Sequence, residues 1–163
     1  MKSARLKALA WAGWLLVLLV GALLAYHYLG RPQPPALQLQ PVDLQLLETD
    51  CRVDRGVCTA GADGARISLE LGPGVPVMRP FAIRVTASLP AGEQPEQVEV
   101  DFEMIGMDMG RNRYRLAQDA DHVWQGVATL PVCTSGRSDW QAVVDIEADS
   151  GRRYRAVFSF ETE

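Results

Sequence analysis

The sequence predicts an all-β domain, folded as an antiparallel β-sandwich and preceded by one N-terminal transmembrane helix. Three observations lead to this prediction. A long uncharged apolar run lies near the N-terminus. The rest of the chain alternates apolar and polar residues with a period of two, which is typical of half-buried strands. Turn residues recur between these stretches without any amphipathic helical pattern, and this spacing describes a sandwich.

The apolar run starts at Ala8 and carries no charge for nineteen residues. About twenty apolar residues cross a bilayer as a helix, so we predict a transmembrane anchor over residues 8–29. Basic residues precede the run, and the positive-inside rule therefore places residues 1–7 in the cytoplasm. A cleaved signal peptide is the alternative, which we favour less because the sequence after Ala22 is a poor cleavage site. The expected location is the bacterial inner membrane, single-pass, with the C-terminal domain in the periplasm.

A proline-rich linker, residues 30–36, separates the anchor from the exported domain, residues 37–163. Beyond Arg31 the chain holds twelve arginines, no lysine and twenty acids, hence a net charge of −8. An acidic body excludes a nucleic-acid partner, which would need a basic surface.

Two cysteines open the domain around a turn sequence, Asp54-Arg55-Gly56. A tight turn would place Cys51 opposite Cys58, and an exported protein lies in an oxidising compartment. We therefore predict a structural disulfide. A pair of metal thiolates is less favoured because the six intervening residues match no common metal spacing. Further along, residues 60–64 are expected to form a loop and residues 72–80 a connector in which Met78 packs. An extended segment or first strand is expected over residues 37–46, and the other predicted strands cover residues 65–71, 81–89, 97–104, 114–116, 122–130, 140–147 and 153–160.

Three of the five methionines fall within six residues, at Met104, Met107 and Met109. Thioethers are soft ligands that favour Cu(I), and Gly106 and Gly110 would allow the backbone to turn the sulfurs toward one point. We call residues 104–112 the methionine loop. Two further candidates lie downstream: Cys133, the odd cysteine, as a thiolate, and His122 as a nitrogen ligand. The alternative is packing, because methionine fills irregular gaps in cores and Met104 continues the apolar face of its strand.

Three stretches together resemble the FixH/YtkA-like exported domains: Phe102–Asn112, Val123–Pro131 and Gly136–Asp145. The resemblance covers about residues 80–147, with a membrane anchor ahead of it. It implies an immunoglobulin-like sandwich, an association with copper handling and cytochrome oxidase assembly, and Met107 and Met109 as the positions that match the family's loop. The chain departs from the family at Val132-Cys133, where a methionine often follows Leu-Pro.

These observations favour a membrane-anchored periplasmic accessory protein that binds Cu(I) and assists copper handling or cytochrome oxidase assembly. Its expected partners are the membrane and a membrane complex such as a cytochrome oxidase or its assembly factors. The alternative is a metal-free immunoglobulin-like interaction module of a membrane complex. We expect no enzyme, because the sequence contains no nucleophile elbow and no phosphate loop.

Overall fold

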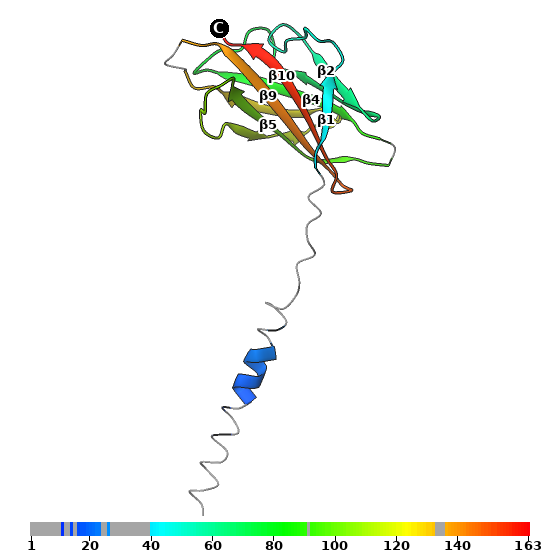
Figure 1. Cartoon of the computed structure of the whole chain (residues 1–163), viewed down its shortest axis with the longest axis vertical. Coiled ribbons are helices and arrows are strands. Elements are labelled where there is room, and N and C mark those ends of the chain that lie inside the picture. The colour runs from blue at the N-terminus through cyan, green and yellow to red at the C-terminus, as the bar shows by residue number, and fades with distance from the viewer. Residues whose placement is uncertain are drawn as a thin grey trace, which may run out of the picture. The chain divides into compact units, whose positions relative to one another are not determined.

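A computed structural model (Figure 1) describes residues 11, 14, 16–23, 26, 40–90, 92–132 and 136–163. Contacts divide the chain into two units, Met1–Gln38 and Leu39–Glu163. In the first unit the described residues are helical. None of the helix that is described has the length and apolar character needed to cross a membrane. The predicted cytoplasmic segment 1–7, the linker 30–36 and much of the predicted anchor lie outside the described residues.

The second unit is all-β over its described residues, which confirms the predicted class. Its core consists almost entirely of inward-facing side chains from alternating strand positions, as a sheet packed on one face requires. Ten strands follow in chain order: β1 (Val42–Leu46), β2 (Cys58–Ala62), β3 (Ala65–Glu70), β4 (Pro80–Ser88), β5 (Pro95–Met104), β6 (Arg113–Arg115), β7 (Ala117–Gln118), β8 (Trp124–Thr129), β9 (Asp139–Ala148) and β10 (Arg153–Glu161).

The strands form one continuous sheet in the order β6-β5-β9-β10-β1-β2-β3-β4-β8-β7. Two segments join its two halves. Strand β1 pairs in parallel with β10 through its first half and antiparallel with β2 through its last two residues. On the other side, β6 pairs with β5 and β7 pairs with β8, and Leu116 alone separates β6 from β7. The sheet therefore closes on itself and resembles a barrel.

The register places the methionine loop at one end of this barrel. Met104, the last residue of β5, lies opposite Trp140 of β9, which lies opposite Phe160 of β10. We call this end the methionine pole. The chain enters the domain at the other end, where Val42 pairs with Tyr154. Tyr154 and Phe160 are six residue steps apart along β10, so the two ends are about 20 Å apart.

Phe102 holds the two halves of the barrel together beneath the methionine loop. Its ring is fully buried and makes edge contacts with Phe81 at 5.6 Å, Tyr114 at 5.9 Å and Phe160 at 5.9 Å. These partners come from β4, β6 and β10. The Tyr114 hydroxyl also donates to the Thr129 carbonyl at 2.9 Å, which ties β6, the strand after the methionine loop, to the end of β8.

Two stretches outside the predicted strands also form strands. Residues 58–62 form β2, although residues 60–64 were expected to be a loop, and its hairpin with β3 turns through Asp63 and Gly64, which both have positive φ, as a tight two-residue hairpin requires. Residues 117–118 form the short strand β7. Both stretches are rich in small or polar residues, so the pattern of alternation is weak there, and pairing with neighbouring strands decides their conformation.

Candidate metal site

The methionine loop begins with a turn that brings two methionines together. The Met107 amide donates to the Met104 carbonyl at 3.2 Å, and the two residues form an isolated antiparallel bridge. Gly106, inside this turn, has a φ of +77°, a conformation that residues with a side chain rarely adopt. The loop ends where the Phe102 amide donates to the Asn112 carbonyl at 3.0 Å. Both ends of the loop are thus tied to β5.

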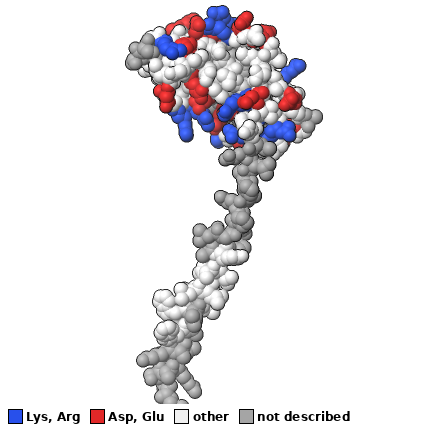
Figure 2. Space-filling view, viewed as in Figure 1, with Lys and Arg blue, Asp and Glu red and all other residues white. Residues whose placement is uncertain are grey.

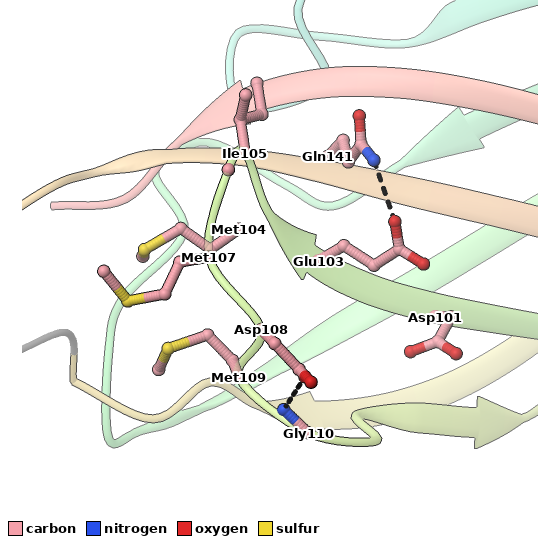
Figure 3. A pocket seen from close by; sticks show the side chains of 10 residues that line it. Asp101, Glu103, Met104, Ile105, Met107, Asp108, Met109, Gly110 and Gln141 are labelled. Carbon is pink, nitrogen blue, oxygen red and sulfur yellow. Dashed lines mark hydrogen bonds between the residues drawn. The ribbon is translucent and has the colours of Figure 1, made fainter.

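The three thioether side chains extend to the same side of this loop (Figure 3). Asp108 extends to the opposite side and accepts a hydrogen bond from the Gly110 amide at 2.8 Å. The three methionines differ in burial: Met104 is 3% exposed, Met109 is half-buried against the core, and Met107 is 38% exposed. Met104 is therefore a core residue, as the packing alternative predicted, while Met107 is accessible from solvent.

A shallow cleft of about 420 Å³ adjoins the loop. Three carboxylates line it besides the methionines: Asp101, Glu103 and Asp108. Asp101 forms an ion pair with Arg113 at 3.0 Å, and Glu103 accepts a hydrogen bond from Gln141 at 2.8 Å. Acidic and basic side chains are interspersed in the same way over the face seen in Figure 2. The cleft is thus lined by three carboxylates, of which Asp101 is balanced by Arg113.

The stretch that leads into β9 also contacts the methionine loop. The Ile105 amide donates to the Asp139 carbonyl at 3.3 Å. Arg137 and Asp139 form an ion pair, which holds the pKa of the Asp139 carboxyl below its usual value through the hydrogen bond from Arg137. The Arg137 guanidinium lies over Gly106, 3.8 Å from the point that a Cβ atom would occupy.

The structure does not bring His122 to the methionine loop. His122 lies in an exposed turn with a φ of +61°, just before β8 begins. Tyr114, two residues beyond the methionine loop, contacts the other end of β8 at Thr129, and the five residue steps from Trp124 to Thr129 span about 17 Å. Cys133 lies outside the described residues, so its predicted thiolate role stays a prediction.

Met78 differs from its predicted packing role. Its side chain is 66% exposed, and its φ is +57°. Its amide donates to the Leu130 carbonyl at 2.8 Å, which holds this backbone conformation in place. Sequence reasoning missed this because nothing in the connector around Met78 distinguishes an inward from an outward side chain.

Cys51 and Cys58 form a disulfide, with 5.7 Å between their Cα atoms. The loop that it closes is fastened to β10: the Val53 amide donates to the Ser159 carbonyl at 3.3 Å, and Arg52 forms ion pairs with Asp54 and Glu161. Both sulfurs are bonded to each other, so the pair serves as the predicted structural disulfide and not as metal thiolates, and it fixes a loop whose Val53 side chain is fully buried.

Among the described residues, no group of three or more histidine, cysteine, aspartate and glutamate side chains is placed to hold a metal ion. Any metal at the methionine pole would thus depend on thioethers. Thioether sulfur selects soft ions such as Cu(I) over hard cations.

No protein-family model and no curated protein matches the chain. Three solved structures of superoxide reductase (neelaredoxin) from Ignicoccus hospitalis are similar to it, with TM-scores of 0.45, 0.43 and 0.43. Their sequence identities are 15%, 15% and 14%. Each covers 60% of this chain, and the match spans 79%, 79% and 80% of those chains.

This comparison corrects the expectation that the chain is not an enzyme, because the similar structures are those of a reductase. At TM-scores below 0.5 and identities near 15%, neither their activity nor a cofactor transfers to this chain. A function for this chain has to rest on the chemistry of its own residues.

Proposed function

We propose that this protein is a membrane-anchored periplasmic accessory factor of the FixH/YtkA-like type, with an immunoglobulin-like domain that binds Cu(I) at its methionine loop. The observation that carries the proposal is the common direction of three thioethers from one short loop (Figure 3). The turn hydrogen bond between Met107 and Met104 keeps two of them adjacent. The three neutral donors suit a soft monovalent cation and need no deprotonation.

The N-terminal unit supports the anchor. Residues 16–23 are helical, and their large apolar side chains are 47–68% exposed. An apolar surface of this kind on all sides of a helix is unfavourable in water and is typical of a helix in a bilayer. We propose the anchor over residues 8–29, in the bacterial inner membrane.

The position of the loop fits a role in delivering copper to a membrane complex. The chain enters the domain at one end, and the methionine pole is the other end. A partner that exchanges Cu(I) can therefore reach the loop without displacing the entering chain. A cytochrome oxidase or one of its assembly factors is the partner that the family resemblance implies.

The test is Cu(I) binding by the full chain in detergent, measured by competition with a chromogenic chelator. Ascorbate is used to keep the copper reduced. A thiol reductant is avoided because it would compete for copper and reduce the disulfide. We expect one Cu(I) per chain and a loss of at least tenfold in affinity in the Met107→Leu/Met109→Leu double variant. Leucine conserves volume, so packing is disturbed little.

Ile105→Leu is the matched control, since Ile105 lies in the same loop, is exposed and has no sulfur. Its affinity should equal that of the wild type. The Cys133→Ser variant measures separately how much the Cys133 thiolate contributes to the Cu(I) affinity. The proposal fails if the wild-type chain does not bind Cu(I) under these conditions.

A further inference from the structure

Trp140 is the nearest aromatic neighbour that the register gives to the methionine loop. It lies directly opposite Met104 in the pairing of β9 with β5, and both side chains are buried, at 1% and 3% exposure. Both therefore project from the same inner face of the sheet. Directly opposed residues on one face have Cβ atoms about 4.5–5.5 Å apart, which brings the indole within reach of the Met104 thioether.

The Trp140 indole carries a polar group that the fold does not use. Its Nε1 is buried and has no hydrogen-bond partner among the described residues. A buried donor without an acceptor is destabilising, and such groups are rare in folded proteins. The stacking of Trp140 on Phe160, with ring centroids 6.4 Å apart, is a contact that phenylalanine could make without this penalty.

Compared with phenylalanine, tryptophan offers a larger and more electron-rich ring face. Tryptophan is the best of the aromatic side chains at holding a cation, at up to about 6 Å from the ring. A metal ion bound to the Met104 sulfur would lie about 2.3 Å from that atom, as in other metal–sulfur bonds. It would then lie within the range of the indole of Trp140.

We infer that Trp140 forms the inner wall of the Cu(I) site, where its indole face contacts the cation that the thioethers of Met104 and Met107 hold. This inference rests on the proposed function and adds a binding residue to the same site. It assigns Met104 to the buried side of the ion and Met107 to its solvent side, in agreement with their exposures. The carboxylates of the adjoining cleft add attraction for a cation at longer range.

Tryptophan fluorescence and affinity together test this inference. Cu(I) is titrated into the full chain in detergent, and the emission is compared among the wild type, Trp140→Phe and Trp124→Phe. We expect Cu(I) to reduce the emission of the wild type and of Trp124→Phe but not that of Trp140→Phe. Trp124 is the matched control because it is also buried but begins β8, at the end remote from the methionine loop.

The affinity of Trp140→Phe should fall by about 2- to 30-fold, the range that a cation–π contact contributes. Its melting temperature should fall no further than that of Trp124→Phe, since both changes leave a cavity in the core and Trp140→Phe also removes an unpartnered donor. A thermal melt of each variant without metal checks this.

The outcomes separate the two proposals. If Cu(I) binds with one ion per chain but neither the emission nor the affinity depends on Trp140, the inference is overturned and the proposed function stands. If the metal analysis finds no bound Cu(I), both are overturned. An equal affinity loss in Trp140→Phe and Trp124→Phe would also overturn the inference, because it would indicate a purely structural role.

Discussion

Gly126 tests the closure of the barrel. A Cβ atom built on Gly126 would lie 2.6 Å from a terminal methyl carbon of Leu116. Leu116 is buried and is the single residue between β6 and β7, where the chain crosses from one half of the sheet to the other. Gly126→Ala therefore requires this methyl group of Leu116 to shift within the core.

The size of the effect depends on two opposing contributions. Overpacking a core costs about 1–3 kcal/mol. Replacing glycine by alanine stabilises by about 0.4–1 kcal/mol through the unfolded chain. We expect a net loss of about 1–2 kcal/mol, and each kcal/mol lowers the melting temperature of a domain this size by about 3–6 °C.

The assay is urea unfolding of the full chain, followed by circular dichroism. Gly56→Ala is the control, because no atom lies within 4 Å of its built Cβ and its φ is not positive. It should be neutral or slightly stabilising. Gly126→Ala should cost less stability when it is made in the Leu116→Ala variant than when it is made in the wild type, since the extra methyl then has room. Equal stabilities of Gly126→Ala and Gly56→Ala would refute the close contact.

Three further predictions concern stability. Cys51→Ser/Cys58→Ser should cost about 2–3 kcal/mol in the chain-entropy model, and adding a thiol reductant to the wild type should produce the same loss; no change in either experiment would contradict the structural role of the disulfide. Gly64→Ala should cost about 1–2 kcal/mol, because Gly64 has a φ of +81°, which penalises a side chain; Asp63→Asn, a residue that tolerates this conformation, should be near neutral in the same urea assay. The hydrogen bond from Arg52 lowers the pKa of Glu161, so the stability from this pair is present above the ordinary carboxyl pKa and is lost as the pH falls through the lowered value. Melting temperatures of the wild type and Arg52→Gln should therefore differ at pH 7 and converge under acid conditions; a difference that persists at the lowest pH would exclude the ion pair as its cause.

The sequence was sufficient to predict the class of the fold and most of its strands, because alternation with period two is strong wherever a strand has one buried face. Strand β5 is the clearest case: Val98, Val100, Phe102 and Met104 are all buried, and the acids between them face outward. Two of these acids, Asp101 and Glu99, pair with Arg113 and Arg115 on β6, which depends on a strand pairing that no local pattern shows.

The candidate site could be predicted only in part. The spacing of the methionines and glycines indicated a loop that could bring sulfurs together. It did not predict that Met104 is buried while Met107 is exposed to solvent, because this difference depends on where β5 ends. The position of His122 at the far end of β8 depends on the path of the chain through β6 and β7, and no local sequence pattern predicts that path. The same holds for Trp140: only the register of β9 on β5 places it opposite Met104.

The closed sheet also affects how the domain meets other molecules. The two outermost strands of the sheet order, β6 and β7, are joined to each other through Leu116. The described domain therefore offers no long unpaired strand edge to a neighbour. Strand addition, by which exposed edges recruit peptides or polymerise, is thus disfavoured. Copies of the domain could lie side by side without joining edge to edge, and recognition would depend on side chains of the loops at the two ends of the barrel.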